Sequence, residues 1–374
     1  MKIIEVKDTS GQKKFVELPF QLYKGNEYWV PPIKSQEYNI FQEKTNPALK
    51  FCEAAFWIAT DDHNRTIGRI GAIKHNPYNE KTGIPYVRIT RFECIDDEKV
   101  AKALFETVFE WALKRNLTVV HGPLGFTNLD LQGLLIEGFN YLPPIASVYH
   151  HAYYKNFFEN QGFEKENDWV EFRLTLGEAA VNKANRGAEL LKKRFGVELR
   201  EFSSIKEVLH YKDQIFEILN DSFDVLPYVT PLTKELMEFY AKKYIALLNP
   251  EYIKMTFVDG EPIGFLISMP SVSRAMQKAK GRLLPFGIFH ILKAKKGKGV
   301  DTLDQILTGV KKDKQNTGAA VIMQAAMQDT MLKNGLKYIE TTGIFETNTN
   351  AISNWKNYDH IQHRRRRCYV KKIS

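Results

Sequence analysis

The residues best suited to chemistry lie late in the chain, where an apolar strand pattern runs into a basic turn and then a helix. Residues 307–320 have the sequence LTGVKKDKQNTGAA. The first backbone N–H groups of a helix lack internal partners, and the helix dipole adds about half a positive charge there. Small residues let an anion approach, and Lys311, Lys312 and Lys314 add favourable charge. This turn predicts a diphosphate site, the alternative being a basic surface turn that caps an ordinary helix.

The same turn resembles the coenzyme signature of the GNAT superfamily of acyl-CoA-dependent N-acyltransferases, V-x-x-x-x-Q/R-x-x-G-x-G/A. Its defined positions are occupied by Val310, Gln315, Gly318 and Ala320. A strand pattern at Tyr338–Ile344, the stretch ETNTNA at 346–351, a short helix and a final strand then follow in the order of the superfamily.

The resemblance implies that acyl-CoA binds here as co-substrate, with no metal. The strand that ends at Val310 would bond the pantetheine amides, and the amides of Asn316–Ala320 would hold the pyrophosphate. The implied coenzyme-binding residues are Val310, Gln315, Asn316, Thr317, Gly318, Ala319, Ala320 and Asn348. An amine would then attack the thioester directly.

Direct transfer needs a base for the ammonium, a donor for the developing oxyanion and an acid for the departing thiolate. Many members of the superfamily supply the acid with a tyrosine four residues after the alanine of N-x-x-A. This chain has Asn348, Ala351 and then Trp355 in that pattern, and an indole does not give a proton to a thiolate. Tyr358 is the nearest substitute.

Two carboxylates, Glu340 and Glu346, bracket the strand beside the expected acyl position and are the candidate bases. Burial in a dry cleft can raise a carboxyl pKa toward neutrality, which suits a base. His360 and His363 near the final strand are alternatives. Each of the four also fits a solvated strand edge.

The composition of the chain is that of an ordinary folded protein, which can position these residues. The 374 residues suffice for two domains, and 44% hydrophobic with 26% charged residues excludes a disordered chain. The net charge of +9 favours anionic partners. Three widely spaced cysteines form no metal or redox motif, the amino terminus lacks a signal-peptide core, and no apolar run reaches the ~18 residues of a membrane span. A cytoplasmic bacterial protein is expected.

One α+β plan repeats at a spacing of roughly 200 residues, which is typical of a tandem pair. We therefore predict an α+β fold with mixed sheets, built from tandem GNAT-like acyl-CoA N-acyltransferase domains. The predicted parts are a first domain at 1–176, a helical linker at 177–196 and the acyltransferase domain at 197–374. The first domain has FECIDDEKVAKAL at 92–104, where acidic side chains would cap a helix and repel phosphate. We predict that it is degenerate.

Residues 282–299, RLLPFGIFHILKAKKGKG, are an addition to a minimal acetyltransferase core. The apolar run Leu283–Leu292 is too short to cross a bilayer, and the lysines after it suit lipid head groups. Peripheral docking on the inner membrane and a lid or core helix over a long acyl tunnel remain equal alternatives. Both fit a long-chain acyl donor, and the chain then resembles bacterial N-acyltransferases that acylate sphingoid bases.

The sequence thus favours an acyl-CoA-dependent N-acyltransferase acting on a small or lipid amine. A non-catalytic acyl-CoA-binding sensor or scaffold is the alternative, supported by Trp355. A nucleic-acid partner is disfavoured, because strand alternation puts only half of Arg364–Arg367 on one face and no aromatic platform accompanies them. The oligomeric state stays open.

Overall fold

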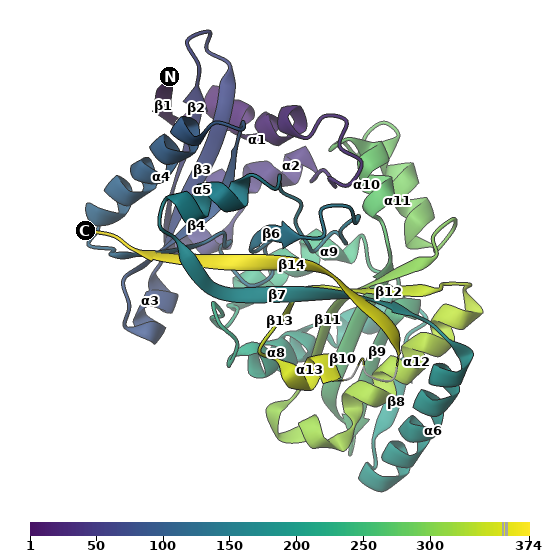
Figure 1. Ribbon diagram of the computed structural model, residues 1–374. Helices are drawn as coiled ribbons and strands as arrows, with labels where there is room; N and C mark the ends of the chain where they lie inside the picture. Colours follow the sequence, from purple (N-terminus) through teal and green to yellow (C-terminus); the bar gives the residue numbers. More distant parts are fainter. Residues whose placement is uncertain (354, 356–357) are drawn as a thin grey trace. The chain divides into compact units, whose positions relative to one another are not determined.

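The computed structural model describes residues 1–353, 355 and 358–374, which divide into two compact units (Figure 1). Unit 1 comprises Met1–Val170, Lys280–Pro285 and Arg364–Ser374, and unit 2 comprises Glu171–Ala279 and Phe286–His363. The boundaries fall inside strand β7, Glu164–Thr175, and strand β14, Asp359–Lys372. Both units combine helices with mixed β-structure, so the predicted fold class is confirmed.

Strands β1 to β5 of unit 1 pair in sequence order, and β6 pairs with β14. Its strands are β1 Lys2–Glu5, β2 Cys52–Thr60, β3 Thr66–His75, β4 Tyr86–Cys94, β5 Val119–Gly122 and β6 Leu134–Glu137. Its helices are α1 Thr9–Leu22, α2 Lys34–Glu37, α3 Asn76–Thr82, α4 Glu98–Leu113 and α5 Tyr154–Asn160. Strands β1 to β4 are antiparallel, β5 is parallel to β4, and β14 is antiparallel to β5. The hairpin predicted around residues 61–65 is confirmed as β2 and β3.

Unit 2 has the strand order β7-β12-β11-β10-β9-β8. Its further strands are β8 Glu198–Glu201, β9 Ile253–Val258, β10 Glu261–Pro270, β11 Thr302–Val310, β12 Tyr338–Thr341 and β13 Ile344–Phe345. Its helices are α6 Glu178–Phe195, α7 Ile205–His210, α8 Lys212–Phe223, α9 Lys234–Ile245, α10 Ser273–Ala279, α11 Gly287–Lys295, α12 Ala319–Lys333 and α13 Thr349–Ser353. In the described chain, no helix has both the length and the apolarity that a membrane span needs.

Helices cover both faces of the unit 2 sheet. A Cβ atom added at Gly264 of β10 would lie 3.2 Å from the Met323 side chain of α12. A Cβ atom added at Gly309 of β11 would lie 2.9 Å from Ser222 Oγ of α8. Because Gly309 pairs with Phe265, the neighbour of Gly264 on β10, the two contacts lie on opposite faces. Helix α12 therefore covers one face and α8 the other.

Most expected elements of unit 2 are present, with shifted ends. The helix predicted at 205–220 is interrupted at Tyr211 into α7 and α8, and the strand predicted at 338–344 is divided into β12 and β13. The segment 177–196 is helical as predicted and forms α6. The helix predicted at 350–357 is described as α13, and residues 354, 356 and 357 of that prediction lie outside the described residues.

The arginine run 364–367 is used inside unit 1. Arg364 is buried and donates to the Tyr141 carbonyl at 3.0 Å, and the buried Arg366 donates to a backbone carbonyl as well. Arg365 and Arg367 lie 2.9 and 2.8 Å from the Asp168 carboxylate. The expected alternation is present. Arg364 and Arg366 bond backbone carbonyls, and Arg365 and Arg367 bond Asp168.

Candidate active site

The parallel strands β11 and β12 of unit 2 diverge, so that the end of β11 has no strand beside it on that edge. Strands β11 and β12 pair only from Thr302↔Tyr338 to Gln305↔Thr341. On its other edge β11 continues beside β10 as far as Val310, with a register shift at Ile306. Thr342, which follows β12, still donates from Oγ1 to the Ile306 carbonyl at 3.3 Å. Beyond Ile306 the backbone of β11 therefore faces the gap between the strands. An extended amide chain such as pantetheine can bond to such an edge as an added strand.

The helix that follows β11 begins without a side-chain cap. Gly318 is the N-cap of α12, and in the described part of the chain no side chain bonds to the first turn. The first bond of the helical ladder runs from Ile322 N to Gly318 O at 3.0 Å. The N–H groups of Ala319–Val321 precede that bond, so they form the start of a helix open to an anion.

Glycine is required at position 318 for two reasons. Its φ of +76° lies in the left-handed region, which other residues adopt at a cost. A Cβ atom there would lie 2.6 Å from the Leu191 side chain of α6. The glycine of the predicted signature therefore fixes both the entry into α12 and its contact with α6.

The basic turn before Gly318 is itself a short 3₁₀ helix, Lys312–Thr317. Its lysines have acidic neighbours that the sequence did not predict. Asp221 accepts from Lys312 N at 2.7 Å, and Asp224 lies 3.3 Å from Lys312 Nζ. Lys314 lies 3.4 Å from Asp313. These exposed ion pairs are weak, so the lysines can turn toward a phosphate when one is present.

The equivalent helix of unit 1 is closed by its own sequence. Asp97 is the N-cap of α4, and its carboxylate accepts from Lys99 N at 2.8 Å. A carboxylate in that position occupies the helix donors and repels phosphate.

The gap between the parallel strands of unit 1 is filled as well. Strands β4 and β5 pair only as far as Arg88↔His121. Beyond that point the buried Leu124 donates its N–H to the Ile89 carbonyl at 2.8 Å, and Arg88 donates to the Gly125 carbonyl at 3.0 Å. In unit 1 the chain itself therefore fills the helix start and the strand gap.

The structure brings together two of the candidate bases, Glu340 of β12 and His363 of β14. His363 Nδ1 lies 3.1 Å from the Glu171 carbonyl, and because a carbonyl only accepts, Nδ1 carries a proton. His363 Nε2 lies 2.8 Å from Glu340 Oε2. Arg173 donates from Nε to Glu340 Oε1 at 2.5 Å. Glu340 is therefore a buried carboxylate with the Arg173 guanidinium on one oxygen and the His363 imidazole beside the other.

A second carboxylate, Asp304, is fully buried on β11 and was not among the candidates from the sequence. Asp304 pairs in register with Glu340, so the two side chains leave the same face of neighbouring strands, about 5 Å apart. They lie one residue before the point where β11 and β12 diverge. An acidic residue inside an apolar strand was the available signal, because Asp is rarely fully buried.

The remaining candidates are distributed around α13. Tyr358 accepts a hydrogen bond from Gln328 Nε2 of α12 at 2.7 Å, and Asn348 caps α13 by accepting from Ala351 N at 3.1 Å. Glu346 is half-buried between β13 and α13. His360 is exposed and contacts the carbonyl of Tyr358. None of these contacts places the four residues at one point.

Trp355, which stands where the superfamily often has tyrosine, is buried. Its indole Nε1 has no hydrogen-bond partner among the residues that the structure describes. An unpaired buried donor costs about 1–3 kcal/mol, so it calls for an explanation.

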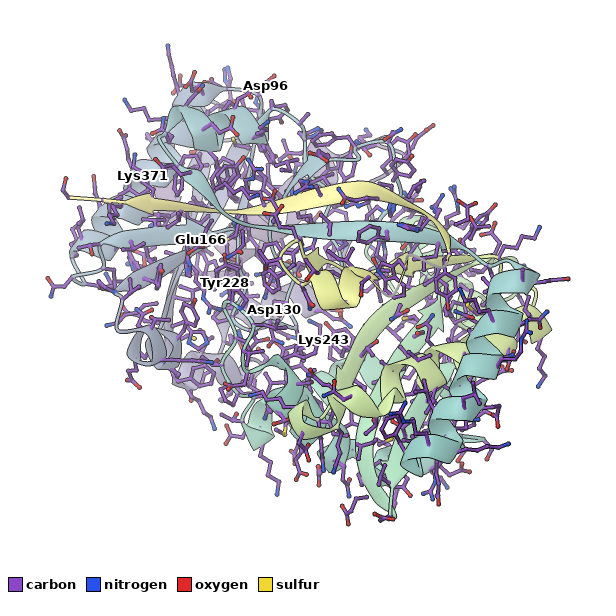
Figure 2. The ribbon with its side chains drawn as sticks, turned by 60° about the horizontal axis from the view of Figure 1, so that its bottom comes forward. Asp96, Asp130, Glu166, Tyr228, Lys243 and Lys371 are labelled. Atoms are coloured by element: carbon purple, nitrogen blue, oxygen red, sulfur yellow. The ribbon has the colours of Figure 1, made fainter. Side chains whose placement is uncertain are left out.

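A strained tyrosine adds a candidate that no sequence signal indicated. Tyr228, labelled in Figure 2, lies in the loop between α8 and α9 and has a φ of +66°. It is buried, and its ring centroid lies 6.2 Å from that of Phe345 on β13. The left-handed conformation is costly for a bulky residue, and such strain concentrates at functional sites.

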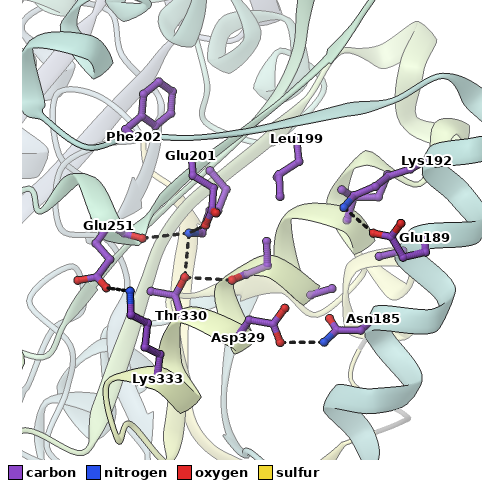
Figure 3. Close-up of a pocket in the computed structure, with 15 residues that line it drawn as sticks. Asn185, Glu189, Lys192, Leu199, Glu201, Phe202, Glu251, Asp329, Thr330 and Lys333 are labelled. Carbon is purple, nitrogen blue, oxygen red and sulfur yellow. Dashed lines mark hydrogen bonds and ion pairs between the residues drawn. The ribbon is translucent and has the colours of Figure 1, made fainter.

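A pocket of about 550 Å³ lies on the α12 face of the sheet, between α6, β8 and the carboxy-terminal half of α12 (Figure 3). Its lining includes the buried Lys254, which donates to Thr330 Oγ1 at 2.8 Å and to the Glu251 carbonyl at 3.1 Å. Asp329 of the same lining accepts from Asn185 at 2.8 Å. A lining so rich in charge does not suit an acyl chain, and Asp304 and Glu340 lie on the opposite sheet face.

Comparison with solved structures identifies the class of fold. The chain matches a tandem GNAT protein from the clavulanic acid biosynthesis pathway with a TM-score of 0.56 and 10% identity, over 99% of this chain and 98% of that one. The chain therefore has the tandem GNAT fold, as the sequence predicted.

Sequence comparison finds relatives over the whole length. No protein-family model matches the chain. A bacterial ceramide synthase from Caulobacter vibrioides (strain NA1000 / CB15N) is 27% identical over 386 residues, covering 100% of this chain and 98% of the relative. Protein YghO from Escherichia coli (strain K12) is 24% identical over 370 residues, covering 96% and 93%.

Proposed function

We propose that this tandem GNAT protein is an N-acyltransferase that passes a long-chain acyl group from acyl-CoA to the amine of a lipid. The amine nitrogen bonds to the thioester carbon, the carbon–sulfur bond breaks, and the ammonium proton leaves to a base. The observation that carries the proposal is the uncapped start of α12 beside the free edge of β11. In unit 1 the Asp97 carboxylate caps the equivalent helix, and Leu124 bonds the equivalent strand edge.

The coenzyme end of the reaction follows from these two features. The N–H groups of Ala319–Val321 hold the diphosphate, helped by Lys311, Lys312 and Lys314. The pantetheine amides bond to the β11 edge beyond Ile306. This arrangement directs the thioester along the gap toward the level of Asp304 and Glu340.

The acceptor end of the reaction is cationic before transfer, because an aliphatic amine is protonated near neutral pH. The buried carboxylates of Asp304 and Glu340 attract an ammonium, and the His363 imidazole lies beside Glu340. A base must contact the amine, so this pair must exchange one of its present contacts to act. Glu346 is the alternative base for the ammonium, and Tyr358 is the proposed acid for the departing thiolate.

Trp355 supports a donor role in this scheme. An indole N–H does not protonate a thiolate, but it can donate a hydrogen bond to the oxyanion or to the departing sulfur. The unpaired Nε1 is explained if its acceptor belongs to the substrate. Thiolate protonation then comes from Tyr358 or from water.

The lipid acceptor is supported by the name of one relative, a bacterial ceramide synthase. A ceramide is an N-acylated long-chain amino alcohol, so a ceramide synthase joins a fatty acyl group to a lipid amine. That relative aligns with the whole of this chain at 27% identity. Acyl transfer to an amine is also the reaction that the coenzyme signature implies.

An acyl-CoA sensor is the second candidate, and two observations favour it. Arg173 and His363 flank the two oxygens of Glu340, and indole replaces the usual tyrosine acid. A sensor would bind the coenzyme and leave the thioester intact.

Thiol release separates the two candidates. Purified full-length protein is mixed with acyl-CoAs of two to eighteen carbons, alone and with a long-chain amino alcohol, and free thiol is followed together with the N-acyl product. The proposal expects amine-dependent release that increases with acyl length. Coenzyme binding without release across the amine panel identifies the sensor. Release with short acyl groups and small amines alone overturns the lipid specificity.

A further inference from the structure

Helix α11 carries its large apolar side chains on the outside. Phe286, Phe289 and Leu292 are 71%, 65% and 42% exposed, whereas Ile291 and Ala294 on the inner side are buried. Monomeric soluble proteins seldom leave adjacent aromatic and aliphatic side chains in water without a function, and such patches mark interaction sites. With Lys293 and Lys296, Phe286, Phe289 and Leu292 form what we call the α11 face.

The segment around α11 has an unusual charge. Between Glu261 and Asp301 the chain contains no acidic residue and eight Lys or Arg. Lys293 and Lys296 are exposed, and their spacing of four and seven residues from Phe289 puts them on its side of the helix. Positive charge is therefore interleaved with the exposed apolar side chains.

Unit 2 holds α11 in this orientation. Lys295 Nζ donates to the Ala246 carbonyl at 2.9 Å, and Asn249 Nδ2 donates to the Lys295 carbonyl at 3.3 Å. Both contacts tie the end of α11 to the segment after α9. Because Phe289 and Leu292 point outward, they do not line an interior acyl tunnel, which disfavours the lid interpretation.

We propose that the α11 face docks on an anionic lipid bilayer. The aromatic and leucine side chains enter the boundary between head groups and acyl chains, and the lysines bond to lipid phosphates while their stems lie along the apolar surface. Each lysine near an anionic leaflet contributes roughly fivefold in partitioning. The inference goes beyond the acyl-transfer proposal, and its test requires neither coenzyme nor turnover.

Flotation of the full-length protein with vesicles of phosphatidylglycerol and phosphatidylcholine provides the test. The protein should float with mixed vesicles, far less with pure phosphatidylcholine, and less as salt rises, because salt screens exposed charges. Lys293→Gln with Lys296→Gln should weaken partitioning about 25-fold. The matched control, Lys206→Gln with Lys234→Gln, changes two exposed lysines elsewhere in unit 2 and should bind like wild type.

The apolar half of the face is tested in parallel. Phe289→Ser with Leu292→Ser should reduce flotation at least tenfold. Val225→Ser, which alters a side chain that is 72% exposed in the same unit, should leave flotation unchanged. Thermal unfolding of each variant verifies that it is folded, which surface changes of this kind should preserve.

A spectroscopic probe verifies contact directly. The three native cysteines are buried, so a polarity-sensitive dye on Leu292→Cys labels one position. Its emission should shift to the blue on mixed vesicles, and the same dye on Val225→Cys should not shift. Absent flotation of the intact protein, or equal flotation of all variants, overturns the proposal. A dimer that Phe289→Ser with Leu292→Ser disrupts, without vesicle binding, assigns the face to a second copy instead.

Discussion

His363 Nε2 and Glu340 Oε2 lie 2.8 Å apart inside unit 2, where both residues are buried. The two belong to strands that are distant in sequence, and each came from the sequence as a separate candidate base. Their contact makes them one buried cluster, with Arg173 on the second oxygen of Glu340.

Glu340→Gln tests that cluster. The amide keeps the size of the side chain but leaves Arg173 and His363 without an anion, so we expect the free energy of unfolding to fall by about 3 kcal/mol. Amine-dependent thiol release should also be lost. Urea unfolding at neutral pH measures the first effect.

Glu346→Gln is the matched comparison, because Glu346 was the other carboxylate candidate and is only half-buried. Its unfolding free energy should stay within about 0.5 kcal/mol of wild type. If Glu346→Gln abolishes thiol release while Glu340→Gln retains it, the base is Glu346 and the account of the buried pair is wrong.

Trp355→Phe tests the unpaired indole. The ring is largely kept and the N–H donor is removed, so kcat should fall on the order of 10²-fold while coenzyme affinity changes little. Trp111→Phe, a buried tryptophan of unit 1, serves as the control. An unchanged kcat in Trp355→Phe shows that the indole donates nothing to the reaction.

Acid should destabilise unit 1 through His150. Burial, with Arg364 and Arg366 nearby, lowers the pKa of His150 to about 3. The unfolded chain binds a proton at this residue below about pH 6.5 and the folded chain does not, so stability present above pH 6.5 is lost as pH falls toward 3. At pH 5 the loss is about 2 kcal/mol.

His150→Asn should remove that part of the pH dependence, since its carbonyl oxygen can still accept from Leu135 N as His150 Nδ1 does. His63→Asn changes an exposed histidine and should leave the pH dependence as it is in wild type. The free energy of unfolding is measured at pH 7 and pH 5. An equal loss between these pH values in wild type and His150→Asn would contradict the assignment.

Much of the fold follows from sequence pattern, because strands, capped helices and glycine turns are locally encoded. The signature Val310, Gln315, Gly318 and Ala320 located the end of β11 and the start of α12 to within a residue. Asp97 likewise indicated the closed helix start in unit 1.

Long-range pairings could not be obtained this way. The contact of Glu340 with His363 depends on which strands lie side by side, and the pairing of Lys312 with Asp224 joins residues far apart in sequence. Tyr228 acquires its strained backbone only when its loop packs near Phe345. Asp304 was within reach, because a charged residue within an apolar strand is rare.

Calorimetric titration with coenzyme A tests the central claim, that the first N–H groups of α12 hold a diphosphate, most directly. Ala320 lies in that first turn, where a carboxylate favours the helix but repels phosphate. Ala320→Glu should weaken coenzyme binding at least about tenfold, and the neutral Ala320→Gln should stay within about threefold of wild type. Equal affinity in Ala320→Glu and Ala320→Gln, or no uptake by the wild type, would contradict the account.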